Sequence, residues 1–168
     1  MRTLALAVAT AAGAGLLPAA PGTWGSALAL PVFLGLERLG PGLFGLTWLA
    51  LVALGVWAAE VTEQIWGLQD DGRIVIDEVA GQILALAPML TLAPGSGWLA
   101  RGGALVTGFV AFRLFDIAKP GPVRWAERRF EGGVGVMADD LVAGALAAPF
   151  VAGWLWLAAG WAVSGGSA

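Results

Sequence analysis

The chain contains no cysteine, no histidine and no tyrosine among its 168 residues. The absence of cysteine excludes disulfides, thiol nucleophiles and thiolate metal ligands. The absence of histidine excludes the imidazole nucleophile, acid, base or metal ligand on which many enzymes depend. Any metal binding or acid–base chemistry in this chain therefore depends mainly on carboxylates, hydroxyls and basic side chains.

Charged residues are also scarce. They make up 12% of the chain, whereas a soluble domain carries about 25%, and 58% of the residues are hydrophobic. This balance is typical of a membrane protein. The formal net charge of −3 argues against nucleic acid as a partner.

The apolar residues gather in runs long enough for membrane helices. Leu141–Val163 is 23 residues without a charge, and Phe44–Ala59 is a second strong candidate. Three further runs are shorter or interrupted by glycine and proline, and are read as tilted spans, re-entrant pieces or buried core helices: Ala27–Leu36, Gln82–Pro94 and Trp98–Phe112. None of the runs alternates with the period of a strand. The sequence predicts an all-α fold, a polytopic helical membrane protein with one domain over 1–168 and a C-terminal transmembrane helix at about 141–163.

Most charges fall in two segments. Glu60–Glu78 carries seven charges and Arg113–Asp140 carries ten. If both segments and Arg2 share one side of the membrane, seven of the nine basic residues lie there, and the positive-inside rule places that side in the cytoplasm. The C-terminus is then expected on the other side, and five crossings are the simplest count.

Acidic residues stand at the edges of three apolar runs, next to basic ones. Hard divalent cations such as Mg²⁺ prefer carboxylate oxygens, and arginine and lysine suit phosphate. The pattern favours metal-assisted chemistry on a phosphorylated, membrane-borne substrate at a polar site between apolar helices. The residues concerned are Asp77, Glu78, Arg113, Asp116, Lys119, Asp139 and Asp140.

Each of these groups also has a simpler interpretation. Asp139 and Asp140 suit an N-cap of the last helix, and Arg113, Asp116 and Lys119 suit a stripe of ion pairs at spacing three. Asp77 and Glu78 suit a solvated helix end. A non-enzymatic helical membrane protein that binds a cation through intramembrane carboxylates remains the alternative function.

The stretch Leu16–Pro31 places Thr23 and Ser26 beside Gly22 and Gly25. A glycine turn with hydroxyls at a helix N-terminus suits an anion, although an ordinary serine N-cap after a Pro-Gly turn is the favoured interpretation of this stretch on its own. The preceding residues, Met1–Gly22, have the shape of a secretory signal peptide.

Four blocks together resemble the signatures of the phosphatidylglycerophosphatase A family. They are PGTWGSALALP, DDGRIVIDEVAG, FRLFDIAKPGPVRWAERRFEGG and GVMADDLVAG, which occur in the family's order between residues 21 and 144. The resemblance implies a bacterial inner-membrane, Mg²⁺-dependent phosphatase that converts phosphatidylglycerophosphate to phosphatidylglycerol and phosphate. It also implies that the first block stays in the mature protein, against the signal-peptide interpretation. Asp71 departs from the proline or histidine of many relatives, which affects only the shape of the loop before Ile74.

Residue roles follow from the matching blocks. The resemblance implies a catalytic set of Asp77, Glu78, Asp116, Asp139 and Asp140. Four of these are expected to bind the metal, namely Asp77, Glu78, Asp139 and Asp140. The substrate phosphate is expected at Thr23, Ser26, Arg113 and Lys119. Whether water or an aspartate attacks phosphorus stays open, with water the first hypothesis.

Overall fold

A computed structural model of the chain describes residues 1–93 and 96–165, with side chains up to Trp161. Every regular element in these ranges is helical, so the predicted all-α fold is confirmed. The helices are α1 (Arg2–Ala9), η1 (Ala14–Leu16), α2 (Pro21–Leu36), η2 (Glu37–Leu39), α3 (Gly40–Trp66), α4 (Ile76–Ala85), α5 (Met89–Leu92), α6 (Trp98–Ala118), α7 (Gly121–Arg129) and α8 (Gly132–Gly165).

Three stretches of the described chain are long and apolar enough to cross a membrane: Pro21–Trp66, which includes the turn between α2 and α3, Trp98–Ala118 and Gly132–Trp161. Large apolar side chains cover their outer surfaces, and Leu46, Leu114 and Trp156 are each more than 60% exposed. Such a surface is stable in a lipid bilayer rather than in water. The protein is therefore a multi-pass membrane protein, as predicted.

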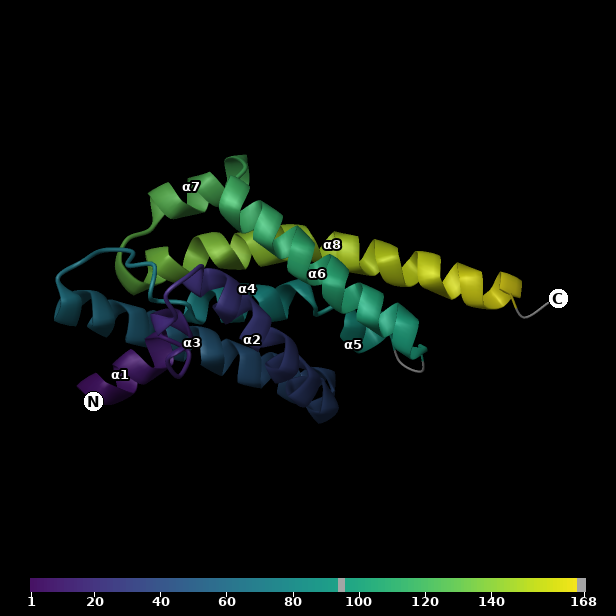
Figure 1. Ribbon diagram of the computed structural model, residues 1–168, viewed down its shortest axis with the longest axis horizontal. Coiled ribbons are helices and arrows are strands. Elements are labelled where there is room, and N and C mark those ends of the chain that lie inside the picture. Colours follow the sequence, from purple (N-terminus) through teal and green to yellow (C-terminus); the bar gives the residue numbers. More distant parts are fainter. Residues whose placement is uncertain (94–95, 166–168) are drawn as a thin grey trace.

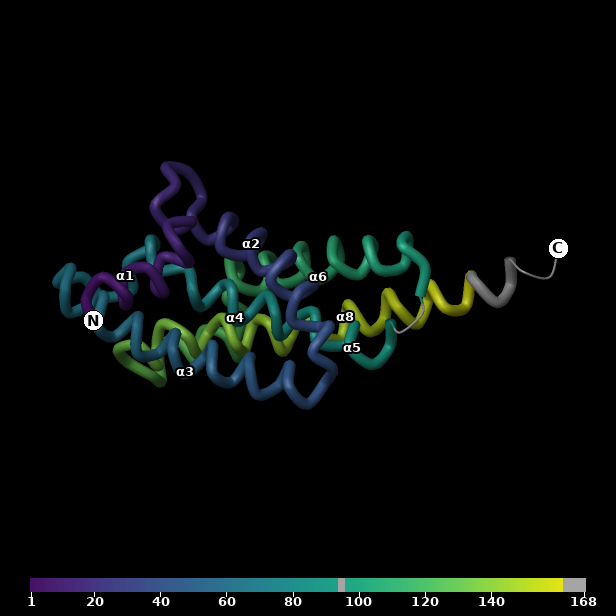
Figure 2. Tube along the Cα trace, turned by 90° about the horizontal axis from the view of Figure 1, so that it is seen from below, coloured from purple at the N-terminus to yellow at the C-terminus, as the bar shows by residue number. Residues whose placement is uncertain are grey.

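The helices run along one long axis and reverse at its two ends (Figure 1). The link between α3 and α4, together with α7 and the start of α8, lies at one end, which we call the polar end. The η2 turn and the start of α6 lie at the other, where Arg101 forms an ion pair with Glu37. Both charged segments thus meet at the polar end, and α8 leads the chain away from it (Figure 2).

Helix α4 lies inside the bundle, packed against α2, α3, α6 and α8. Its ten residues rise about 15 Å, half of what a hydrocarbon core requires, and eight of them are buried. Of the three interpretations open for Gln82–Pro94, the buried core helix holds for the residues in α4, whereas the chain then turns into the short α5, where Leu92 is exposed. Close backbone contact holds α4 against α8, because a Cβ on Gly144 would lie 2.2 Å from the carbonyl oxygen of Gly81.

The N-terminal segment packs against the bundle. Ala5 and Ala9 of α1 are fully buried, α1 lies along α3, and the amide of Val75 donates to the carbonyl oxygen of Ala9 at 2.8 Å. The segment with the shape of a signal peptide thus supports the backbone directly before α4.

Two helix starts correct the capping interpretations. Helix α2 begins at Pro21, so Ser26 lies in its second turn and is not an N-cap. Helix α8 begins at Gly132, so Asp139 and Asp140 lie in its third turn and cap nothing. Glu60 of α3 caps α8 instead, since its Oε2 accepts from the amide of Gly133 at 2.8 Å. The helix therefore starts nine residues before the predicted Leu141.

Candidate metal centre

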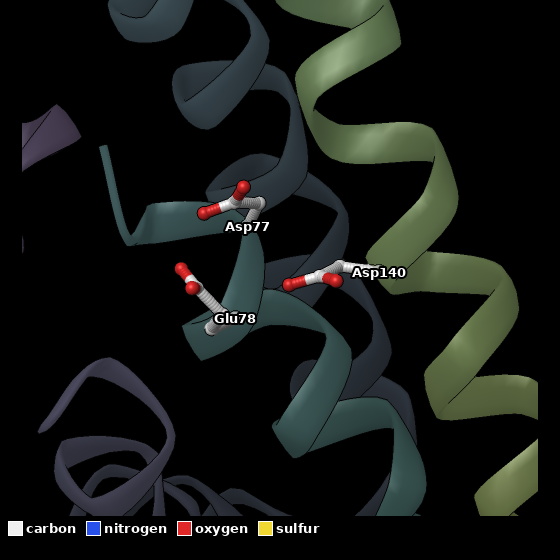
Figure 3. Close-up of side chains that lie close together, drawn as sticks. All are labelled: Asp77, Glu78 and Asp140. Carbon is white, nitrogen blue, oxygen red and sulfur yellow. The ribbon is translucent and has the colours of Figure 1, made fainter. Parts of the chain in front are cut away.

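Three carboxylates from two helices meet near the polar end. Asp77 and Glu78 stand in the first turn of α4, and Asp140 reaches them from α8 (Figure 3). One oxygen from each lies within 4.8 Å of the others. Asp77 is 8% exposed and Asp140 is 3% exposed, whereas the Glu78 side chain is 15% exposed, so the cluster is largely shielded from bulk water and reaches it through Glu78.

Each of these carboxylates has a buried oxygen with no hydrogen-bond partner among the described residues, namely Asp77 Oδ1, Glu78 Oε2 and Asp140 Oδ2. Burying such groups without partners is costly. Burial, with the charges of Glu78 and Asp140, raises the pKa of Asp77 well above its ordinary value. The cluster therefore takes up either protons or a cation.

A divalent cation of the Mg²⁺ type fits this donor set. Mg²⁺ takes oxygen ligands, and a few carboxylates with water and phosphate complete its shell. Asp77, Glu78 and Asp140 would supply the protein's share. Three of the four predicted metal ligands are thus brought together.

Arg113 of α6 borders the cluster. Its Nη1 lies 2.5 Å from Asp116 Oδ2, 3.9 Å from Glu78 Oε1 and 3.4 Å from the hydroxyl of Ser26. Its Nε is buried and has no partner among the described residues. Arg113 therefore brings positive charge and a spare donor to the edge of the carboxylates. The predicted stripe is half present, because Arg113 pairs with Asp116 whereas Lys119 turns elsewhere.

Helix α2 closes the cluster from a third side. A Cβ on Gly22 would lie 2.1 Å from Glu78 Oε1 and 3.1 Å from Arg113 Nη1, so only glycine leaves room for both. The Ser26 hydroxyl donates to the carbonyl oxygen of Gly22 at 2.8 Å. Thr23 lies half-buried in the same turn. The first sequence block thus shapes the site mainly through the absence of a side chain.

Asp139 takes a different partner. Its Oδ2 accepts from the Lys119 ammonium at 2.9 Å, and the same ammonium contacts Glu127 of α7 at 2.6 Å. Burial alone would lower the pKa of Lys119, but these hydrogen bonds outweigh it and hold the pKa above its ordinary value. The structure therefore places Asp139 and Lys119 in an ion-pair network between α6, α7 and α8.

Sequence reasoning missed Gln82. This residue of α4 is fully buried, and both polar atoms of its amide lack a partner among the described residues. It follows Glu78 by four residues, the spacing that stacks side chains on one helix face. A lone amide inside an apolar run, one turn after two acids, was the available signal.

The fold and the site define a class, a multi-pass helical membrane protein with a buried carboxylate cluster beside an arginine. The chain belongs to the phosphatidylglycerophosphatase A family, which matches residues 7–155. This confirms the resemblance seen in the four blocks and, with it, the prediction of a phosphatase.

Curated relatives agree with this assignment. The phosphatidylglycerophosphatase A of Escherichia coli K12 is 37% identical over 136 residues, which are 81% of this chain and 74% of that protein. The Haemophilus influenzae protein of the same name is 37% identical over 133 residues, 78% and 76% of the two chains. A putative phosphatidylinositol-3-phosphatase of Bacteroides thetaiotaomicron is 38% identical over 160 residues, 92% and 95% of the two chains. No solved structure matches.

Proposed function

We propose that this protein hydrolyses phosphatidylglycerophosphate to phosphatidylglycerol and phosphate with the help of Mg²⁺. The observation that carries the proposal is the cluster of three carboxylates beside Arg113, each with a buried unpartnered oxygen, in a chain of this family. In the reaction water adds to phosphorus, the bond from phosphorus to the glycerol oxygen breaks, and that oxygen takes up a proton.

Asp77, Glu78 and Asp140 are the residues that would hold the cation. A bound Mg²⁺ supplies positive charge that polarises the phosphoryl group. The protein's own part is to keep three acids aligned in a site largely shielded from bulk water, which strengthens the charge interactions there. The packing of α4 between its neighbours provides that rigidity.

Arg113 is the group that we assign to the substrate phosphate. Its guanidinium already stands between Glu78, Asp116 and Ser26, and its Nε remains available as a donor. Guanidinium groups recognise phosphate through parallel hydrogen bonds. Asp116 orients this arginine from one helical turn away. Lys119, which already contacts two carboxylates, is assigned to holding α7 rather than to the phosphate.

The site is proposed to face the cytoplasm from a bacterial inner membrane. It lies toward the polar end, where seven of the nine basic residues would gather if Arg2 shares that end. The positive-inside rule assigns such an end to the cytoplasm. A lipid headgroup at that membrane surface is within reach of a cluster near the ends of the helices.

Phosphatidylinositol 3-phosphate is the second candidate substrate. The relative named for that activity covers nearly all of this chain, at an identity similar to that of the two phosphatidylglycerophosphatases. Both lipids present a phosphate monoester at a membrane surface, so the buried cluster does not separate them.

The deciding experiment measures phosphate release by the full chain, purified in detergent, with Mg²⁺ or with EDTA. We expect turnover of phosphatidylglycerophosphate with Mg²⁺ and none with EDTA. Full turnover in EDTA contradicts the metal mechanism, and a preference for phosphatidylinositol 3-phosphate selects the second candidate. Cation binding without hydrolysis of either lipid contradicts both candidate substrates.

A further inference from the structure

Helix α7 connects two candidate membrane spans through short links. The candidate span Trp98–Ala118 ends two residues before it, and the candidate span Gly132–Trp161 begins two residues after it. Each link spans three Cα-to-Cα steps, which reach at most about 11 Å. The start of α7 therefore lies close to the end of the α6 span and near the level of the lipid headgroups.

The two sides of α7 differ. Val123 and Ala126 are buried against the bundle, and the carboxylate of Glu127, although exposed, forms an ion pair with Lys119. The exposed residues Arg124, Trp125, Arg128 and Arg129 form what we call the basic face. At 100° per residue these four positions fall within about 140° of the helix circumference. Phe130 extends this face, with its ring edge-on to Trp125 at 6.1 Å between centroids.

The arginines of the basic face differ from the other basic residues near the site in their ion pairing. Four other basic residues, Arg73, Arg101, Arg113 and Lys119, each form an ion pair with a carboxylate. Within the described part of the chain, the three arginines of α7 form no ion pair, although acidic residues are plentiful at this end. The guanidinium of Arg129 instead lies 5.9 Å from the centre of the Phe130 ring.

We propose that the basic face of α7 binds the anionic phospholipid headgroups of the surrounding leaflet. Arginines directly next to a spanning helix attract acidic lipids, and tryptophan favours the headgroup level. An amphipathic helix with cationic and aromatic residues outward is suited to such a surface. This inference is independent of the proposed reaction, and it gives α7 the task of gathering acidic lipid near the site.

The absence of cysteine makes a direct test simple. Gly121, at the start of α7, has open space around its Cβ position, as has Gly42 at the opposite end. Gly121→Cys and Gly42→Cys are labelled with a fluorescent donor, and the full chain is placed in nanodiscs of mixed lipid. Energy transfer to acyl-labelled phosphatidylglycerol is compared with transfer to acyl-labelled phosphatidylcholine.

We expect phosphatidylglycerol to be enriched at least about twofold near Gly121, at low salt and not near Gly42. Replacing all three arginines by glutamine should abolish the enrichment, whereas replacing all three by lysine should retain it. Thermal melting of each variant shows whether it is folded. Equal transfer from both lipids in the parent, or enrichment that survives the glutamine variant, would overturn the proposal.

Discussion

Asp139 and Asp140 are neighbours in the chain but have different partners. Adjacent residues of a helix point about 100° apart, so Asp140 turns to the cluster while Asp139 turns to Lys119. The two positions therefore form a matched pair for mutation.

We expect Asp140→Asn to lower the affinity for Mg²⁺ and the phosphatase activity, each at least about tenfold. Asp139→Asn is expected to keep Mg²⁺ affinity at the parent level, because its oxygen is bound to an ammonium. Mg²⁺-induced shifts in Tm report the affinity, and phosphate release reports the activity. An equal loss of Mg²⁺ affinity in both variants would place Asp139 in the cluster.

The raised pKa of Asp77 gives a pH dependence with a defined sign. Above the ordinary carboxyl value of about 4, the unfolded chain releases this proton, while the cation-free folded protein retains it. The free energy of unfolding without cation then falls as the pH rises toward the raised pKa. Mg²⁺ requires the ionised carboxylate, so its apparent affinity should rise over the same range.

This dependence is measured as the increase in Tm on adding Mg²⁺, between about pH 5 and pH 8. The increase should grow with pH in the parent and stay small in Asp77→Asn at every pH. An increase in Tm that is constant across this range would show that Mg²⁺ does not displace a proton from Asp77.

At the scale of elements, α2 approaches the carboxylate cluster closely at Gly22, which has no side chain. Gly22→Ala would place a methyl group against the carboxylate of Glu78, the movable end of a flexible side chain. We therefore expect the variant to fold, with Glu78 displaced and both Mg²⁺ affinity and activity reduced at least about tenfold.

Gly35→Ala on the same helix is the control for this change. Nothing lies within 4 Å of its Cβ position, and alanine favours a helix by up to about 1 kcal/mol over glycine. Its Tm and its activity should match or exceed those of the parent. If Gly22→Ala behaves like Gly35→Ala, the approach of α2 does not position Glu78.

The sequence predicted the existence of the helices better than the residues at which they begin. The uncharged run after Asp140 predicted a helix from about 141, because hydropathy identifies the apolar segment and not the residue at which a helix begins. The start at Gly132 depends on Glu60, which caps the amide of Gly133 from a distant helix. The same limit explains Ser26, whose residue type suggested a cap that α2 places at Ala20 instead.

At the scale of the whole molecule, the two ends of the bundle should lie on opposite sides of the membrane. A membrane-impermeant maleimide is expected to label Gly42→Cys in intact spheroplasts of a bacterial host. Gly121→Cys should be labelled only after the membrane is permeabilised, because its end carries most of the basic residues. The reverse pattern of labelling would mean that the site faces away from the cytoplasm.

The composition and the order of the blocks were enough to predict an all-helical membrane protein and its family, and they named the three carboxylates that the structure brings together. These are properties of residue type and spacing, because long apolar runs can cross a bilayer only as helices and hard cations require carboxylates. Tertiary structure alone decided that α4 is a buried ten-residue helix, and that Asp77, Glu78 and Asp140 meet while Asp139 pairs with Lys119. The physical reason is that helical rotation and close glycine contacts between α2, α4 and α8 set where each carboxylate points.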